Sequence, residues 1–124
     1  MNTVESVAYR LVELCREQKF EQAVKELYAE NITSYEPAGS KNPVTKGFDA
    51  VSANVTRFVE NTIELNDLRI SDPIIADNFF SITMKMNCKM EGMPAAMPMD
   101  EVCVYHVLDG KIVNEHFFHT VHGQ

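Results

Sequence analysis

The chain has 124 residues and a mass of 14.1 kDa, which is the length of one domain and too short for two ordinary ones. Hydrophobic residues make up 45% of it, so it can bury a core without disulfides or metal, and intrinsic disorder is excluded. With 11 basic and 18 acidic residues the net charge is -7, which provides no positive field for nucleic acid or anionic lipid. We therefore expect a single domain over residues 1–124, with neither nucleic acid nor a membrane as partner.

The cysteines and the first residues indicate a cellular compartment. Cys15, Cys88 and Cys103 are an odd number without paired spacing, which is typical of a reduced protein. The first residues lack the basic leader and continuous apolar stretch of a secretory signal. No apolar run approaches the roughly 18 residues that span a bilayer. These features predict a cytoplasmic protein.

Three helices are predicted in the first half of the chain. Apolar residues at positions 4–15 recur at helical spacing, with Asn2 and Glu5 placed to form a capping box. An apolar stripe predicts a second helix over 19–30, and another predicts a third over 48–61. Between them we expect a short strand over 31–36, ended by Pro37, and a loop over 38–47 that contains two glycines.

The second half has the two-residue period of strands. Residues 80–90 alternate between apolar and polar side chains, and 63–76 are strand-like, with Pro73 indicating an edge or a bulge. Two further strands are predicted over 100–108 and 111–120, because the intervening Asp109-Gly110 is a strong hairpin signal. Helices followed by antiparallel strands predict an α+β fold rather than α/β.

Common catalytic and metal-binding motifs are missing from the sequence. It contains no Gly-rich phosphate loop, no Cys-x-x-Cys pair and no Gly-x-Ser-x-Gly. His116, His119 and His122 are spaced by three, but on a strand His119 points away from the face that the other two share. We therefore expect neither a metal nor a cofactor.

Two acidic residues beside prolines are the candidates for chemistry. Glu36 precedes Pro37 at a strand end, and Asp100 follows Pro98-Met99 at the start of another strand. A carboxyl group that faces an apolar cavity loses hydration, which raises its pKa toward the range useful for proton transfer. The alternative for each, which is the commoner case, is a solvent-facing acid at a loop junction.

Several segments resemble a known superfamily. The run LYAENITSYEPAGS at 27–40, followed by KGFDAV at 46–51, resembles the SnoaL-like and steroid delta-isomerase branch of the nuclear transport factor 2-like superfamily. PMD at 98–100 and DGKIV at 109–113 extend the resemblance over nearly the whole chain. It implies a cone-shaped, cystatin-like fold, in which three N-terminal helices pack on a curved antiparallel sheet. Function does not follow from this fold alone, because it carries many activities.

The resemblance also implies roles for the two acids. Glu36 lies where the steroid isomerases have their general base, and Asp100 lies where they have a protonated acid that donates a hydrogen bond to the substrate oxygen. The tyrosine that these enzymes carry on the first helix falls near Leu11 or Val12, which are apolar. This departure speaks against steroid isomerisation itself.

The alternation of side chains along each strand predicts which further residues line the implied site. If Asp100 points inward, alternate residues of its strand do so too, and the neighbouring strands contribute the remaining wall. The predicted pocket residues are Met84, Met86, Cys88, Val102, Val104, Glu115, Phe117 and His119. The alternative for the methionines is plain core filling. Residues of opposite parity, including Glu101, Cys103 and Tyr105, would cover the outer face, where relatives commonly form homodimers.

These expectations predict an isomerase, cyclase or lyase that acts on a small apolar or carbonyl-bearing ligand. Such an enzyme requires the carboxyl groups of Glu36 and Asp100 to converge on one cavity of roughly 300 Å³ or more. The alternative is a non-catalytic ligand-binding or dimerisation module of the same fold. A docking domain for a protein partner is the remaining possibility, for which the sequence offers no obvious additional binding segment.

Overall fold

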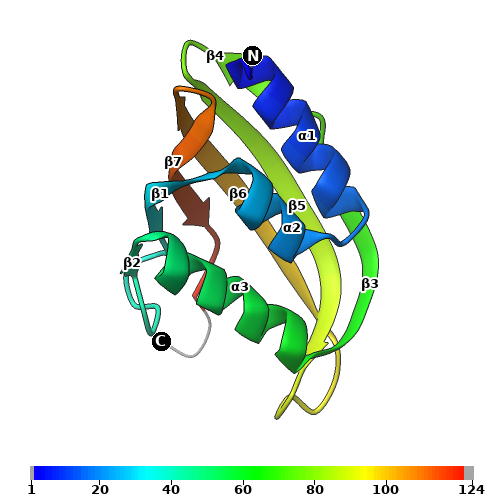
Figure 1. Ribbon diagram of the computed structural model, residues 1–124. Coiled ribbons are helices and arrows are strands. Elements are labelled where there is room, and N and C mark those ends of the chain that lie inside the picture. Colours follow the sequence, from blue (N-terminus) through cyan, green and yellow to red (C-terminus); the bar gives the residue numbers. More distant parts are fainter. Residues whose placement is uncertain (1, 122–124) are drawn as a thin grey trace.

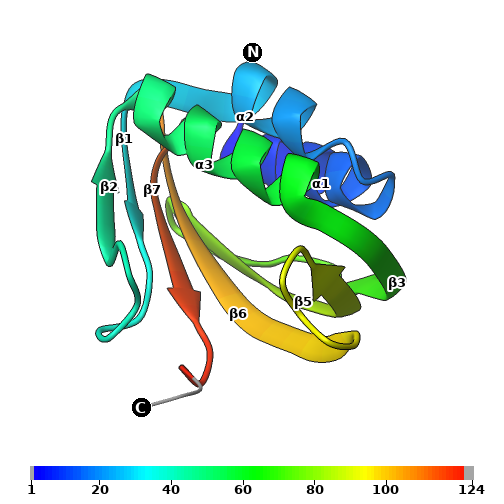
Figure 2. The same cartoon turned by 90° about the horizontal axis from the view of Figure 1, so that it is seen from below.

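Three helices lie against the concave face of one curved seven-stranded sheet in the computed structural model, which describes residues 2–121 (Figures 1 and 2). The helices are α1 (Val4–Arg16), α2 (Phe20–Leu27) and α3 (Phe48–Asn61). The strands are β1 (Tyr28–Tyr35), β2 (Val44–Lys46), β3 (Thr62–Ile70), β4 (Ile74–Ala76), β5 (Phe79–Met90), β6 (Met97–Leu108) and β7 (Lys111–Phe118). The α+β class is confirmed.

The sheet is mixed and not purely antiparallel. Its order is β2-β1-β7-β6-β5-β3, with β4 paired to β5, and β1 runs parallel to β7. The remaining pairs are antiparallel. The three-residue strands β2 and β4 lie in segments that the sequence predicted as a loop and as part of one longer strand, because three residues are too few to display a period.

Two helix boundaries differ from the prediction. The capping box of α1 uses Thr3 and Ser6, one residue after the expected pair: the Ser6 amide donates to Thr3 Oγ1 at 3.0 Å, and the Thr3 amide donates to Ser6 Oγ at 2.9 Å. Helix α2 ends at Leu27, and Tyr28 already has extended backbone. Tyr28 is buried at the start of β1, where tertiary packing overrides helical periodicity. The range of α3 is as predicted.

The β5/β6 pairing determines which side chains reach the interior. Alternate residues of β5 are buried as predicted, from Phe80 to Cys88. In β6 the buried residues are Cys103, Tyr105 and Val107, whereas Val102 is 44% exposed, so the predicted parity of this strand is wrong. Cross-strand partners share a face, and Ile82 lies opposite Cys103.

A bulge in β7 explains why the buried face of β6 is the opposite of the predicted one. Asp109 and Gly110 both have positive φ, of 50° and 76°, as the predicted two-residue hairpin turn requires. A regular hairpin from this turn would pair Glu115 with Val104. The register shifts by one residue at Val113, so Glu115 pairs with Tyr105 instead, and both side chains are buried.

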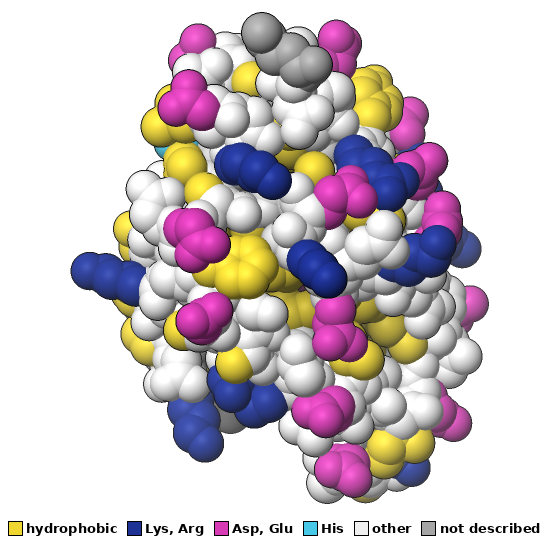
Figure 3. Space-filling model, in the orientation of Figure 1, with side chains coloured by type: hydrophobic (Ala, Val, Ile, Leu, Met, Phe, Trp, Pro, Cys, Tyr) yellow, Lys and Arg dark blue, Asp and Glu magenta, His cyan; other side chains and the backbone are white. Residues whose placement is uncertain are grey.

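The helical side of the molecule has a mixed surface. Acidic and basic side chains are interspersed over it, with apolar side chains visible between them (Figure 3). One ion pair, from Arg10 Nε to Glu26 Oε2 at 2.6 Å, joins α1 to α2. Within residues 2–121, none of the helices combines the length and the apolar character needed to cross a membrane.

Candidate functional site

A cavity of about 290 Å³ lies between the three helices and the concave face of the sheet. Its walls are mostly apolar and include aromatic rings from both layers. Phe20 and Phe58 meet edge-to-face at 5.9 Å between α2 and α3, and Tyr105 meets Phe117 at 6.5 Å on the sheet. The volume is near the lower limit of small-molecule sites, so it suits a compact ligand.

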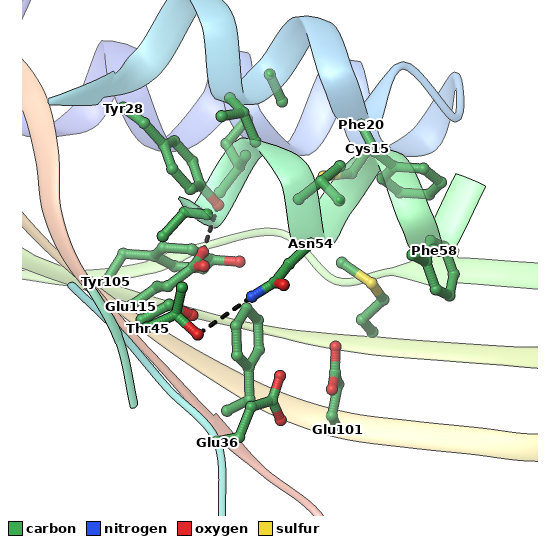
Figure 4. Close-up of a pocket in the computed structure, with 18 of the residues that line it drawn as sticks. Cys15, Phe20, Tyr28, Glu36, Thr45, Asn54, Phe58, Glu101, Tyr105 and Glu115 are labelled. Carbon is green, nitrogen blue, oxygen red and sulfur yellow. Dashed lines mark hydrogen bonds between the residues drawn. The ribbon is translucent and has the colours of Figure 1, made fainter. Parts of the chain in front are cut away.

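Two carboxyl groups lie at the same end of this cavity (Figure 4). Glu36 directly follows β1, and its amide donates to the Pro43 carbonyl at 2.8 Å, which closes the loop after the strand. Glu101 comes from β6, where it lies opposite Met84. Burial raises the pKa of both groups, and it raises that of Glu101 to about 7, with a further contribution from the charge of Glu36.

His119 lies beside Glu36 at this end of the cavity. Its Nε2 is 3.3 Å from Glu36 Oε2, and its Nδ1 is 3.0 Å from the Thr120 carbonyl oxygen. The Thr120 carbonyl raises the pKa of His119 most, and the carboxyl groups of Glu36 and Glu101 raise it further. In return, His119 limits the rise in the pKa of Glu36.

A third carboxyl group, Glu115, is buried in the cavity wall on β7. It is only 3% exposed, and the Tyr28 hydroxyl donates a hydrogen bond to its Oε1 (Figure 4). Burial raises its pKa to about 7, although the hydrogen bonds from Tyr28 and from Ser34 act in the opposite direction. Thr45 and Asn54 add one more polar pair to the wall, with Asn54 Nδ2 donating to Thr45 Oγ1 at 3.1 Å.

Most of the predicted site residues line the cavity, and a minority do not. Glu36, Met84, Met86, Glu115, Phe117 and His119 border it. Cys88 is fully buried in the core and does not border the cavity. Val102 and Val104 belong to the outer face of β6, for the parity reason given above.

Asp100 is the main correction to the predicted site. It is exposed and pairs with Lys85 on the outer face of the sheet, so its carboxyl group does not converge with Glu36 on the cavity. Asp100 lines a second hollow, which shares Met99, Glu101 and His119 with the cavity. The neighbouring Glu101, which the sequence placed on the outer face, is the acid that reaches the cavity.

Other cavity residues escaped sequence reasoning for different reasons. Tyr28 falls within the predicted second helix, whose apolar stripe concealed its role. Tyr105 and Glu101 were assigned to the wrong face. The β5/β6 register is what places both inward, because Glu101 lies opposite Met84 and Tyr105 lies opposite Phe80.

The two described histidines of the predicted triplet, His116 and His119, do not lie around a common point. His116 lies on the outer face, stacked on Tyr35 with ring centroids 4.3 Å apart, whereas His119 borders the cavity. His122 lies outside the described residues. Among residues 2–121, no group of three or more histidines, cysteines and acids is placed to hold a metal ion.

Three helices on the concave face of a curved sheet form the fold of solved structures described as NTF2-like and as ketosteroid isomerase-like. The sequence model of the SnoaL-like domain matches residues 2–119. The chain therefore belongs to the SnoaL-like domain family. A search of curated proteins found no match.

Solved structures agree with this assignment. A protein from Mesorhizobium loti, named as a candidate SnoaL-like polyketide cyclase and, in brackets, carbohydrate phosphatase, is 26% identical over 94% of this chain and 99% of its own, with a TM-score of 0.88. An NTF2-like protein of unknown function from Burkholderia pseudomallei is 13% identical over 95% of this chain and 92% of its own, with a TM-score of 0.76. A ketosteroid isomerase-like protein from Catenulispora acidiphila, in complex with trimethylamine, is 14% identical over 82% of this chain and 76% of its own, with a TM-score of 0.68.

Proposed function

We propose that this protein is an enzyme of isomerase, cyclase or lyase type that moves a proton on a small, mostly apolar, carbonyl-bearing compound. The observation that carries the proposal is the placement of Glu36 and Glu101 at one end of an apolar cavity. Polyketides are rich in carbonyl groups, so the name given to the Mesorhizobium loti relative supports the same class of substrate.

The surroundings of the two acids suggest different roles for them. Glu101, with a pKa of about 7, keeps its proton below that pH and, while protonated, can donate a hydrogen bond to a carbonyl oxygen. Glu36 ionises first, because a histidine beside it favours the carboxylate. Glu36 would take a proton from the carbon next to the carbonyl group. The electrons of that C–H bond would move toward the oxygen, where Glu101 stabilises the developing negative charge.

The charges around the cavity narrow the substrate class. Three carboxyl groups, from Glu36, Glu101 and Glu115, face or border it, and no lysine or arginine is among the described residues that line it. An anionic ligand would be repelled by any of these carboxylates that is ionised. The preferred substrate is therefore uncharged or cationic, and carboxylates and phosphates should be poor ligands.

The test is a turnover screen with small enones, steroids and polyketide-like ketones, followed by ultraviolet absorbance. Wild type should convert at least one compound. Glu36→Gln should lose most of that activity and still bind the compound in a thermal-shift assay, because the amide matches the carboxylate in size. Glu30→Gln, which replaces an exposed acid of β1, is the matched control and should retain full activity. Unchanged turnover in Glu36→Gln would remove this residue from the mechanism.

One feature favours the alternative of a non-catalytic ligand-binding module. Leu11 borders the cavity in the region where the resemblance places the tyrosine of the steroid isomerases, and the Tyr28 hydroxyl is bonded to Glu115. A binding module would give a ligand-induced rise in Tm without turnover. Glu36→Gln would then leave the Kd unchanged.

We also propose that the protein is a cytoplasmic homodimer. The outer face of the sheet exposes Phe79, Val102 and Phe118, which are 45%, 44% and 55% accessible, and Val102 and Phe118 are cross-strand partners. These exposed apolar side chains on one face of the sheet favour contact with a second copy of the chain. All three cysteines are buried and free, which supports the reducing environment of the cytoplasm.

A further inference from the structure

We propose that His119 and Glu36 share one proton between Nε2 and Oε2, and that His119 relays to solvent the proton that Glu36 removes from a substrate. The relay rests on the proposed function. The shared proton does not, because it is a property of the protein without substrate. His119 is a positioning residue in this scheme, since it acts through Glu36.

The Thr120 carbonyl sets the protonation pattern of the imidazole ring. A carbonyl oxygen can only accept a hydrogen bond, so His119 Nδ1, 3.0 Å away, must carry a hydrogen. In a neutral imidazole only one nitrogen carries hydrogen, so Nε2 is then an acceptor. The backbone at Thr120 therefore selects the tautomer with hydrogen on Nδ1.

The contact with Glu36 then requires a proton of its own. Nε2 lies 3.3 Å from Glu36 Oε2, and a bare nitrogen facing a carboxylate oxygen would be two acceptors in contact. One proton on either atom turns this contact into a hydrogen bond. The pair is then an imidazolium with a carboxylate, or a neutral imidazole with a carboxylic acid.

The other groups around His119 favour the charged form. Glu36 faces it from the segment after β1, Glu101 acts on it from β6, and Asp100 borders the same neighbouring hollow. All three are acids, and both the Thr120 carbonyl and the first two acids raise the pKa of His119. The resting pair is accordingly an imidazolium beside the Glu36 carboxylate.

The relay follows from this resting state. When Glu36 takes a proton from the substrate, its negative charge disappears and the imidazolium loses one of the groups that stabilise it, while the Thr120 carbonyl remains. His119, whose side chain is 30% exposed, then releases its Nε2 proton to water. The bare Nε2 accepts the carboxyl proton from Glu36, which returns to the carboxylate. One proton has left the substrate and one has entered the solvent. The same path in reverse returns a solvent proton to the enolate through Glu36, so an isomeric product keeps the hydrogen count of the substrate.

The shared proton is tested by nitrogen NMR on protein with 15N-labelled histidine, using His119→Asn to assign the signal. The neutral His119 signal at high pH should show hydrogen on Nδ1 and none on Nε2. Glu36→Gln should preserve this tautomer and lower the pKa of His119, because it removes a neighbouring negative charge. Glu30→Gln, the exposed control, should change neither. A neutral tautomer with hydrogen on Nε2, or an unchanged pKa in Glu36→Gln, would overturn the shared proton.

The relay is tested by turnover in D₂O of whichever compound the screen identifies. Wild type should incorporate solvent deuterium into the product, and His119→Asn should lower kcat at least tenfold with little change in KM, together with a loss of deuterium incorporation. Full retention of the substrate proton by wild type would overturn the relay. If no compound is converted, the proposed function and the relay fail together, while the tautomer measurement still decides whether the proton is shared.

Discussion

Glu101 on β6 lies directly opposite Met84 on β5, so the two side chains share the inner face of the sheet. The adjacent Asp100 lies opposite Lys85 on the outer face. The chain therefore presents two consecutive acids, one beside an apolar cavity and one exposed on the outer face. Burial raises the pKa of the first, Glu101. This pair provides a matched comparison for the proposed chemistry.

Glu101→Gln should change the pH dependence of turnover. Glu101 donates a hydrogen bond only while protonated, so wild-type kcat/KM should fall as the pH rises through about 7. An amide at this position does not titrate, so kcat/KM of the variant should no longer fall as the pH rises through about 7. The rate should be lower by on the order of 10², because the amide is a weaker hydrogen-bond donor. Asp100→Asn is the control and should keep both the rate and this fall with pH. A fall that persists in Glu101→Gln would assign it to another group.

Glu115→Gln should flatten the pH dependence of stability. The pKa of Glu115 is about 7 in the folded protein, above its ordinary value of 4.5. The folded state therefore keeps a proton that the unfolded chain releases, and the free energy of unfolding should fall as the pH rises from about 4.5 to 7. The contribution of this fully buried group is on the order of 3 kcal/mol.

Urea unfolding at pH 5 and pH 8 measures this effect. The free energy of unfolding of Glu115→Gln minus that of wild type should be larger at pH 8 than at pH 5. The Glu101 contribution should remain in the variant, because its pKa is raised independently by burial. Glu64→Gln, at an exposed position of β3, should retain the wild-type slope. An identical slope in Glu115→Gln would show that Glu115 ionises normally.

Tyr28→Phe should destabilise the protein more at pH 8 than at pH 5. The Tyr28 hydroxyl is a donor to the buried Glu115, and it lowers the pKa of that carboxyl. Its removal leaves the carboxylate without this bond, at a cost of about 1–3 kcal/mol. Tyr9→Phe is the control, since Tyr9 is 52% exposed and its change should stay within about 0.5 kcal/mol. Equal losses at both pH values would contradict a role in stabilising the charged form.

Val102→Lys should convert the proposed dimer to a monomer. The substitution places a charge within the exposed apolar face of β6. Val59→Lys is the matched control, because Val59 is an exposed valine, 37% accessible, on α3. Size-exclusion chromatography with light scattering should report a dimer for wild type and Val59→Lys, and a monomer for Val102→Lys. A monomeric wild type, or a dimeric Val102→Lys, would rule out this interface.

The face of β6 shows why a correct fold prediction still misplaced an acid. Both faces of this strand carry apolar residues, with Cys103 and Tyr105 inside and Val102 and Val104 outside, so its sequence has no alternation that marks the buried side. A regular hairpin would have placed Val104 opposite Glu115. The bulge at Val113 shifts the register by one residue, and a shift of one residue exchanges the side chains that face the core with those that face solvent.

The sequence by itself determined the features that depend on neighbouring residues. These include the stripes of α1 and α3, the alternation of β5 and the turn at Asp109-Gly110, whose positive φ values only a few residue types adopt readily. The resemblance also placed Glu36 correctly at the cavity, because a proline-marked strand end is a local feature.

Only the tertiary structure decided which groups meet. Tyr28 and Glu115 are 87 residues apart in the chain, and Glu36 and His119 are 83 apart. Their contacts depend on the parallel pairing of β1 with β7, which no local pattern encodes, and on the bulge that turns Glu115 inward. A single domain of this length can bury only a few carboxyl groups. The register of its strands selected Glu101 and Glu115 from 18 acidic residues and left Asp100 in solvent.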